Sequence, residues 1–228
     1  MSLAVPQPSA TLILLRDAKN GPEVFMVKRH SKTHFGGLFV FPGGVVDAMD
    51  SQPHPLTTQS LNDKQASKLL NLDNGGLCYF IAAIRETFEE TGYILAKTLA
   101  GDWIDTEQEV VGNARSELLN TEKTLIDICK LNDWQLALEN VYYFNHWITP
   151  AHAPRRFDTR FFIAKVPDNQ CGSHDGRELV SSQWLAPQAA LEKHQNKEMP
   201  MITPTLHSLQ SLQSLKHTDQ LARYALKK

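Results

Sequence analysis

Two apolar runs near the N-terminus predict a β-hairpin. Residues 10–16 and 24–29 are rich in apolar and β-branched side chains, and Asn20-Gly21 lies between them. This order favours two antiparallel strands joined by a loop somewhat longer than the tightest type. A third short strand over residues 38–41 then leads into Gly43-Gly44, where the sequence predicts a tight turn.

Apolar residues recur at helical spacing over residues 79–91. Ile81, Ile84 and Phe88 share one face of the predicted helix, and Gly92 is placed to end it. The polar side chains of this segment occupy another face. The sequence therefore predicts an amphipathic helix with one face in the core.

The second half of the chain predicts a mixture of helices and strands. Helix is expected over residues 116–138, and strands are expected over 142–148 and 160–166. A last helix over about 204–226 carries leucines at every third position. Such a stripe usually packs on the parent core, with a dimer contact as the alternative. Its members are Leu206, Leu209, Leu212 and Leu215.

Composition limits the kind of protein this can be. The chain has 228 residues, 42% of them hydrophobic, which is enough for a full core, and we expect a single domain over residues 1–228. A net charge of −2 does not indicate the basic surface that a nucleic-acid-binding protein needs. Three distant cysteines suggest neither a disulfide framework nor a zinc site, and a reducing cytoplasm fits them best. They are Cys78, Cys129 and Cys171.

The sequence also lacks membrane and targeting signals. No apolar run approaches the roughly 18–20 residues that a membrane helix needs, and the N-terminus does not resemble a signal peptide. The chain ends in Leu226-Lys227-Lys228, which is not a serine-lysine-leucine peroxisomal address. We therefore expect no membrane association and a cytoplasmic location.

Three glutamates lie three and four residues apart on the predicted helix. Glu86, Glu89 and Glu90 stand just after Arg85. Residues at this spacing share a helix face, so carboxylates repel by roughly 0.2–0.5 kcal/mol per pair unless a cation lies between them. Carboxylate oxygens suit hard divalent ions such as Mg²⁺. For this pattern alone, the alternative is a solvated acidic helix face.

A glycine-containing segment upstream favours the cation site. Phe41-Pro42-Gly43-Gly44 precedes Asp47 and Asp50, and glycine lets the backbone approach a ligand closely. Together the two segments resemble the Nudix box: Gly, five residues, Glu, seven residues, Arg-Glu, an apolar residue, any residue, Glu-Glu, any residue, Gly and an apolar residue. Gly44 begins the box and Asp50 stands at the first Glu. The second half is filled by Arg85, Glu86, Glu89, Glu90, Gly92 and Tyr93, with Thr87 at a usually apolar position.

The spacer inside this box is unusually long. Residues 51–84 number 34 where the family pattern has seven. Loop-closure entropy grows only logarithmically with length, so an insertion is tolerated if its ends return to one place. A split box resembles the Nudix branch of the mammalian peroxisomal coenzyme A diphosphatase and its bacterial relatives. Residues 147–150 and 155–164 also resemble sequences of that branch.

The resemblance implies an α+β fold, a Nudix-type α/β/α sandwich with a mixed sheet. The insertion, at about 51–78, contains Pro53 and Pro55, a short helix near 63–72, and Asn74-Gly75-Gly76 as its stop. Because it is too long for a passive turn and its ends are anchored in the box, we expect a helical flap over one edge of the active-site cleft. The alternative is an insertion that faces solvent and has no role in substrate selectivity.

The resemblance also implies a divalent metal, Mg²⁺ or Mn²⁺, held by Glu86, Glu89 and Glu90. The metal would clamp a diphosphate, polarise phosphorus and activate water. Gly44 would add a carbonyl ligand or would serve only as a turn residue. Arg85 is expected to orient one of the glutamates through a bidentate salt bridge. Two further acids are expected beside the ligands, Asp47 and Asp50.

Other charged residues are candidates for substrate binding and proton transfer. Arg155, Arg156 and Arg160 suit substrate phosphates, because guanidinium groups bind them bidentately, although each alone is more often a solubility charge at a strand edge. Glu178 stands where a late-loop general base could lie, and a surface glutamate is the alternative. Histidines at metal-ligand spacing are absent, so no metal role is expected for His34, His146 and His152.

These expectations together predict an enzyme that hydrolyses a nucleoside diphosphate linked to another group. Coenzyme A or an acyl derivative is the favoured substrate, and ADP-ribose, NADH and dinucleoside polyphosphates are the alternatives. A second alternative is a Nudix-fold module that senses a ligand or binds a partner without catalysis. The crowded carboxylates argue against it, because a binding module does not need them. The partner is a small-molecule substrate, and the protein is expected to be a monomer or a homodimer.

Overall fold

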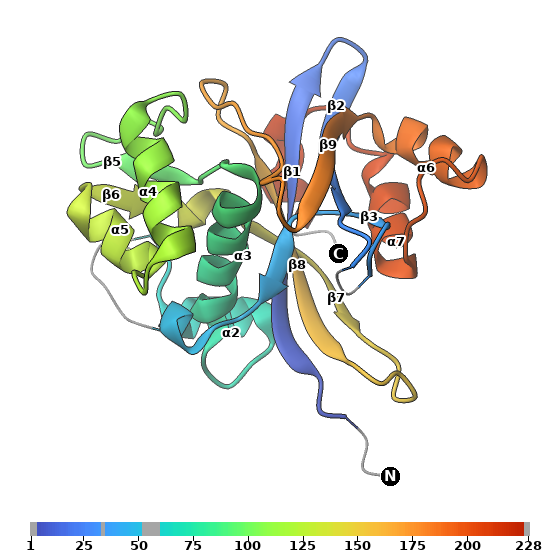
Figure 1. The fold of residues 1–228 in the computed structure, drawn as a ribbon, viewed down its shortest axis with the longest axis horizontal. Helices are drawn as coiled ribbons and strands as arrows, with labels where there is room; N and C mark the ends of the chain where they lie inside the picture. The colour runs from blue at the N-terminus through green and yellow to red at the C-terminus, as the bar shows by residue number, and fades with distance from the viewer. Residues whose placement is uncertain (1–3, 33–34, 52–59, 226–228) are drawn as a thin grey trace.

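A mixed β-sheet forms the centre of the molecule in a computed structural model that describes residues 4–32, 35–51 and 60–225. Seven described strands belong to it, with the order β3-β2-β1-β8-β7, while β4 pairs with β1 and β9 with β2 (Figure 1). β1 runs antiparallel to β2 and β4 but parallel to β8. The bounds are β1 Gln7–Ala18, β2 Gly21–Arg29, β3 Phe39–Val40, β4 Gly43–Val45, β7 Tyr142–Ile148, β8 Phe157–Lys165 and β9 Leu179–Leu185.

The predicted hairpin is confirmed, but its loop is shorter than expected. Ala18 pairs with Gly21, so Lys19 and Asn20 alone form the loop. Gly21 has a φ of 114°, which favours glycine and permits this tight connection.

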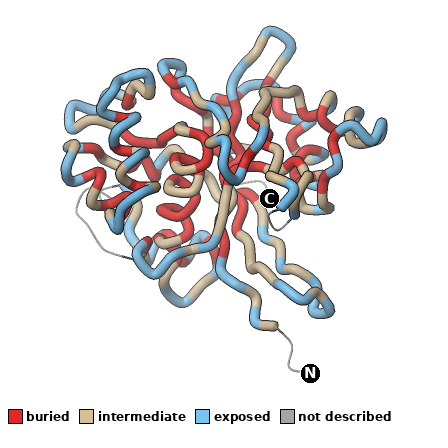
Figure 2. Tube along the Cα trace, viewed as in Figure 1, coloured by how far each residue is buried: buried red, intermediate tan, exposed pale blue. Residues whose placement is uncertain are grey.

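Alternation along the strands divides the core into two layers. Leu12 and Leu14 of β1 join the apolar cluster on one face of the sheet, whereas Ile13 and Leu15 join the cluster on the other face. Strand side chains alternate between faces, so a strand buried on both sides reads as a continuous apolar run. Figure 2 shows the buried positions concentrated along the sheet and along the helix faces turned toward it.

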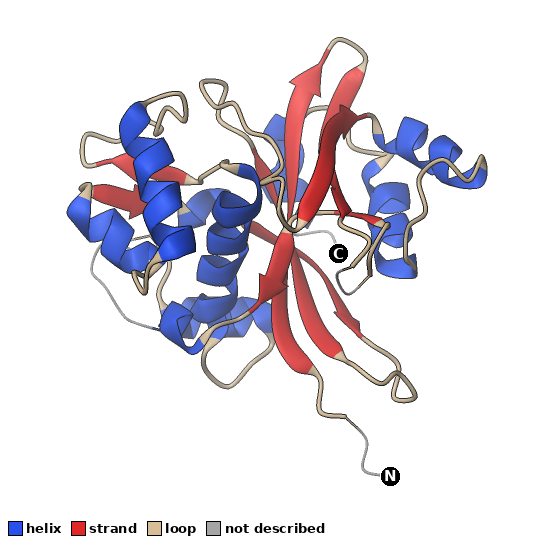
Figure 3. Ribbon diagram, in the orientation of Figure 1, coloured by secondary structure: helices blue, strands red, loops and turns tan. Residues whose placement is uncertain are grey.

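Helices cover both faces of the sheet (Figure 3). One face packs against α3 (Gly76–Thr91), beyond which lie α4 (Glu109–Asn120), α5 (Leu125–Leu131) and a small sheet of β5 (Ala96–Thr98) and β6 (Trp134–Leu136). On the other side lie α6 (Pro187–Gln195), α7 (Thr203–Leu212) and α8 (Leu221–Ala225), the last against β7 and β8. Short 3₁₀ helices span Ala48–Ser51, Leu138–Asn140 and Thr218–Gln220. The arrangement is the expected α+β sandwich.

The amphipathic helix predicted over 79–91 is confirmed as α3. Ile81, Ile84 and Phe88 are fully or almost fully buried. Gly92 caps the helix with a φ of 80°, and its N–H donates to the carbonyl of Phe88. One face of α3 therefore lies in the core, which fixes the direction of its acidic side chains.

The described part of the insertion forms a cap for α3 rather than the expected flap. Its helix α2 (Asp63–Leu70) packs on α3, and Asp63 accepts hydrogen bonds from the N–H groups of Gly75 and Leu77. The hydroxyl of Ser67 accepts one from Gly76. Backbone N–H groups at the start of a helix have no acceptor within that helix, and the side chains of α2 supply the acceptors here. Residues 52–59 of the insertion lie outside the described residues.

Replacing Asp63 by Ala is expected to destabilise the protein by about 1–2 kcal/mol, because it removes both acceptors at the start of α3. The melting temperature of the variant should fall by about 2–4 °C per kcal/mol. Asp73→Ala is the matched control, because Asp73 is exposed in the following turn. An unchanged melting temperature for Asp63→Ala would contradict this role.

Two predicted helices are shorter than the sequence suggested. The segment predicted as helix over 116–138 is α4, which starts earlier, then α5 and strand β6. Thr124 and Asp127 form a capping box that starts α5, and this signal divides the segment. The C-terminal helix predicted over about 204–226 ends at Leu212, and Thr218 then binds Asp17 of β1. The leucine stripe packs on the parent core as predicted.

The three cysteines are free thiols. Among the described residues, no helix has the length and apolar character required to cross a membrane.

Candidate active site

The two glycines of the box lie in a short strand, not in the predicted tight turn. Gly43 pairs with Thr11 and Gly44 with Ala10, as part of β4. A Cβ atom on Gly44 would lie 2.4 Å from the carboxylate of Glu86, and one on Gly43 would lie 2.4 Å from the carbonyl oxygen of Ala10. The absence of side chains therefore lets β4 lie directly against the acidic face of α3.

Arg85 joins the two ends of the insertion. Its guanidinium group donates to both carboxylate oxygens of Asp50, at 2.8 and 3.0 Å, and to the carbonyl oxygen of Val45 at 2.9 Å. A third nitrogen donates to Glu86 at 2.8 Å and lies 3.4 Å from Glu89. The bidentate partner is thus Asp50, and a single nitrogen of Arg85 makes the contacts to both glutamates. The split box closes at this ion pair.

Asp50 is buried, with 3% of its surface exposed. Besides Arg85, it accepts the N–H of Asp47 at 2.7 Å. Neither acid lines the large cavity described below, so both lie behind the candidate ligands.

A cavity of about 1010 Å³ opens beside α3 and β4. β1 pairs with β2 through residues 15–18 and with β4 through residues 9–11, so the sheet divides at this point. Glu86, Glu90 and Gly44 line the cavity. Glu89 instead lines a separate hollow of about 170 Å³ with Arg85 and Asp50. The structure therefore brings two of the three predicted ligands together.

Glu90 is the most deeply buried of the three glutamates, with 6% of its surface exposed. One carboxylate oxygen accepts the N–H of Gly43 at 3.0 Å, and the other lies 3.6 Å from Arg29. Burial raises its pKa well above the usual value, and the nearby charge of Glu86 adds to this effect. Burial also raises the pKa of Glu89.

Arg29 was missed by sequence reasoning. It lies at the end of β2, lines the cavity, and bridges Glu90 and Glu178, the latter at 3.2 Å. The only signal was a basic residue directly after an apolar strand. Glu178, the predicted general base, also lines the cavity and is held at the start of β9 by Asp175, which accepts its N–H.

Of the three predicted phosphate-binding arginines, Arg155 alone lines the cavity, and its guanidinium lies 5.2 Å from the ring centre of Phe157. Arg156 instead donates to the backbone carbonyls of Thr149 and Ala4. Arg160 is buried, with 4% of its surface exposed, and lies over the ring of Tyr79. Strand alternation turns Arg160 to the α3 face of the sheet.

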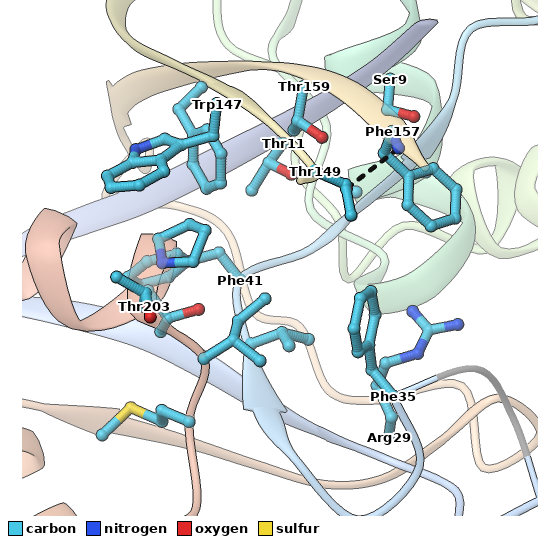
Figure 4. A pocket seen from close by; sticks show the side chains of 18 of the residues that line it. Ser9, Thr11, Arg29, Phe35, Phe41, Trp147, Thr149, Phe157, Thr159 and Thr203 are labelled. Carbon is cyan, nitrogen blue, oxygen red and sulfur yellow. Dashed lines mark hydrogen bonds between the residues drawn. The ribbon is translucent and has the colours of Figure 1, made fainter. Parts of the chain in front are cut away.

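Aromatic, aliphatic and hydroxyl side chains form the rest of the cavity wall. Figure 4 shows Trp147 and Thr203 at one end, Phe35, Phe157 and Arg29 at the other, and several threonines between them. No sequence motif points to this wall, because its members come from five separate segments. The wall includes Ser9, Thr11, Phe41, Thr149, Thr159, Phe161, Met201, Ile202 and Leu206.

Comparison with known families identifies this arrangement. The family model of the NUDT19 Nudix domain matches residues 51–212, well over half of the chain. The chain belongs to the Nudix family. Its split box, closed by the ion pair of Arg85 and Asp50, is thus a variant of the Nudix box.

Curated Nudix relatives include proteins named acyl-coenzyme A diphosphatase NUDT19 from several vertebrates. The protein from Xenopus laevis is 25% identical, with 89% of this chain and 62% of the relative covered. The protein from Homo sapiens is 23% identical, with 83% and 60% covered. The chain thus spans less than two thirds of the length of these relatives.

A solved structure shares the whole fold. A Nudix hydrolase from Alicyclobacillus acidocaldarius superposes with a TM-score of 0.77 at 23% identity, and 97% of each chain is covered. This likeness supports the Nudix-type α+β fold, including the elements that surround the cavity.

The residues of this Nudix site fit a hard divalent cation. Within the described residues, His, Cys, Asp and Glu side chains do not form a ready group of three ligands. Glu86 and Glu90 nevertheless face one cavity beside Gly44, whose missing Cβ leaves the space next to the Glu86 carboxylate open. Carboxylate and carbonyl oxygens are the donors that Mg²⁺ and Mn²⁺ prefer.

The pKa of Glu86 is raised to about 7 by burial and by the charges of Glu89 and Asp50, against the opposing effect of Arg85. The folded, metal-free protein therefore holds this proton more tightly than the unfolded chain, whose glutamate has an ordinary value of 4.5. The resulting stability is fully present below about pH 4.5 and is lost as the pH rises through about 7.

Glu86→Gln is therefore expected to raise the melting temperature of the metal-free protein at pH 8, by roughly 2–4 °C per kcal/mol of relieved burial cost. At pH 5 the gain should be much smaller, because the wild-type carboxyl is then protonated. Thermal unfolding in EDTA at both pH values measures this difference. Equal melting temperatures at pH 8 would show that the Glu86 charge carries no cost.

Proposed function

We propose that this chain hydrolyses the diphosphate bond of coenzyme A and its acyl thioesters with Mg²⁺ or Mn²⁺. The observation that carries the proposal is the position of Glu86, Glu90 and Gly44 beside a large, mostly uncharged cavity. The names of the curated relatives support the substrate class. The products would be a phosphopantetheine and adenosine 3′,5′-bisphosphate.

Each charged residue of the cavity has a distinct role in this proposal. Glu86 and Glu90 would hold the metal together with the carbonyl of Gly44, and Arg85 fixes Glu86 in place. A bound divalent metal supplies neutralisation of charge on the non-bridging phosphate oxygens. Glu178 accepts the proton of the attacking water, and Arg29 positions the Glu178 carboxylate.

We assign Arg155 to a terminal phosphate of the substrate. It stands at the cavity end that also holds Phe35 and Phe157, whose ring centres are 6.3 Å apart. Aromatic side chains suit a nucleobase, and a guanidinium beside them suits the 3′-phosphate of coenzyme A. Glu89, Arg156 and Arg160 lie outside the cavity and are left out of this assignment.

Arg155→Ala is expected to raise KM for coenzyme A by roughly three- to tenfold with a smaller change in kcat, as for the loss of a binding contact. The effect should shrink for dephospho-coenzyme A, which lacks the 3′-phosphate. Arg156→Ala is the matched control, which should lower the melting temperature and leave KM unchanged. Equal KM changes for the two substrates would remove Arg155 from this phosphate.

The proposed function is tested with a substrate panel. Purified protein and Mg²⁺ are incubated with coenzyme A, acetyl- and octanoyl-coenzyme A, ADP-ribose, NADH and a dinucleoside polyphosphate, and products are resolved by chromatography. We expect adenosine 3′,5′-bisphosphate from the coenzyme A compounds and no turnover with excess EDTA. Faster cleavage of another panel member would reassign the substrate, and inactivity on all of them would favour a binding module.

We also place the activity in a reducing compartment such as the cytoplasm. Support comes from the three free thiols, since secreted proteins tend to pair their cysteines.

A further inference from the structure

Residues 171–178 form a loop between β8 and β9, here called the base loop, whose first half lies against α3. A Cβ atom on Gly172 would lie 2.6 Å from the ring of Tyr93 and 2.7 Å from the carbonyl oxygen of Thr91. The N–H of Ser173 donates to that same carbonyl oxygen at 2.9 Å. Since only glycine permits so close an approach, Gly172 seats the base loop on the C-terminal end of α3.

The second half of the base loop is held by β2 and β9. The N–H of His30 donates to the carbonyl oxygen of Glu178 at 2.7 Å, and Nδ1 of His174 lies 3.1 Å from Oγ of Ser182. Arg29 contacts the Glu178 carboxylate at 3.2 Å. Because one half is fixed to α3 and the other to the sheet, the base loop sets the position of Glu178 relative to the glutamates of α3.

Asp175 organises the turn between these two anchors. One of its carboxylate oxygens accepts the N–H groups of Arg177 and Leu179, at 3.1 and 2.9 Å, and the other accepts that of Glu178 at 3.1 Å. An aspartate can in this way supply the acceptors that a regular element would otherwise provide. Leu179 is fully buried, so the turn ends on a residue that the core holds in place.

The charge of Asp175 also acts on the end of α3. Arg115 of α4 donates from two nitrogens to the carbonyl oxygen of Glu89, at 3.1 and 2.9 Å. Burial lowers the pKa of the Arg115 guanidinium, and the negative charge of Asp175 opposes this effect. Asp175 therefore lies within electrostatic range of the α3 turn that carries Glu89 and Glu90.

A general base must hold its carboxylate within hydrogen-bond reach of the attacking water, and a displacement of about 1 Å can cost about 100-fold in rate. The side chain of Glu178 is 60% exposed, so its direction depends on the backbone that carries it. We propose that Asp175 is a positioning residue that acts through Glu178, by fixing the turn that presents this carboxylate to the cavity. The proposal rests on the proposed function, in which Glu178 accepts the proton of the attacking water.

A double-mutant cycle tests whether Asp175 acts through Glu178. Asp175→Ala should lower kcat for coenzyme A by roughly tenfold or more with KM changed less than about twofold, because the base moves while the binding contacts remain. In a Glu178→Gln background the same change should lower kcat by less than about twofold, because the base is already lost.

Two further variants accompany the cycle. Asp175→Asn keeps an oxygen that can accept two of the three N–H groups, so its kcat should lie between those of wild type and Asp175→Ala. Asp168→Ala is the matched control, because the Asp168 side chain is 90% exposed in a neighbouring loop, and it should keep the wild-type kcat.

Amide hydrogen exchange of the metal-free protein gives a readout that does not depend on turnover. Asp175→Ala should speed exchange at the N–H groups of Glu178 and Leu179 by about tenfold, because they lose their acceptor. Asp168→Ala should exchange like the wild type. The affinity for Mn²⁺ should stay within about twofold of the wild-type value in Asp175→Ala, because Asp175 is not one of the proposed ligands.

The outcomes separate this proposal from the proposed function. Additive losses in the cycle, a rise in KM in place of the fall in kcat, or unchanged exchange in Asp175→Ala would overturn the positioning role and leave coenzyme A hydrolysis standing. Wild-type turnover in Glu178→Gln would overturn the role of Glu178 as base and, with it, that of Asp175. Inactivity of the wild type on every coenzyme A compound would overturn the proposed function as well.

Discussion

Replacing Glu90 by Gln is expected to lower kcat/KM by at least about 100-fold, the size of effect that follows the loss of a metal-site group. Glu90 is buried, faces the cavity and receives a hydrogen bond from Gly43. Glutamine keeps the shape but removes the charge that a divalent cation needs. Glu86→Gln should have a similar effect, since Glu86 lies in the same cavity beside Gly44.

The structure separates these two glutamates from the third. Glu89 lines another hollow, so Glu89→Gln should reduce kcat/KM less than either change. Glu109→Gln, in an exposed part of α4, is the neutral control. Circular dichroism should show that all variants fold, and Mn²⁺ titration should show weaker binding for Glu86→Gln and Glu90→Gln. Wild-type turnover in either variant, or full activity in excess chelator, would disprove the metal mechanism.

The sequence was most informative where its pattern was local and strong. The helix over 79–91 was predictable because apolar spacing, Gly92 and the acidic face all agreed. The N-terminal hairpin and the strand over 142–148 were predictable from their apolar runs. The segment over 116–138 was not, because the capping box at Thr124 divides an otherwise helical composition.

The site was harder to predict, because its geometry depends on contacts between distant segments. Helical spacing places Glu86, Glu89 and Glu90 near one another, but α3 is rotated so that only two of them face the cavity. Arg155 and Arg160 belong to one basic segment, but Arg155 lies in the bend before β8 whereas Arg160 lies within β8 on the α3 face, so only Arg155 reaches the cavity.

The insertion shows the same limit. Its length and position in the box suggested a role at the cleft, whereas Asp63 and Ser67 show that its helix α2 completes the N-terminus of α3. Composition alone cannot separate these roles, because both need a short polar helix. The pairing of Asp63 with Gly75 and Leu77 depends on how α2 packs on α3.

Breaking the ion pair that closes the split box should strongly destabilise the protein. Arg85 is mostly buried and contacts three carboxylates, those of Asp50, Glu86 and Glu89. Arg85→Ala leaves a buried Asp50 without its partner, and breaking a buried pair in this way costs about 3–5 kcal/mol. The melting temperature should fall by roughly 2–4 °C per kcal/mol.

A double-mutant cycle with Asp50 separates the ion pair from the other contacts of Arg85. Asp50→Asn removes the carboxylate charge that Arg85→Ala leaves without a partner. The double variant should therefore be more stable than the sum of the two single losses predicts. Arg85→Lys keeps the positive charge but cannot form the bidentate contact with Asp50. Its free energy of unfolding should therefore lie between those of wild type and Arg85→Ala. Denaturant unfolding of the metal-free protein measures the free energies of unfolding of the four proteins of the cycle and of Arg85→Lys. Additive losses, or an Arg85→Ala variant as stable as wild type, would show that the two halves of the box are held together by other contacts.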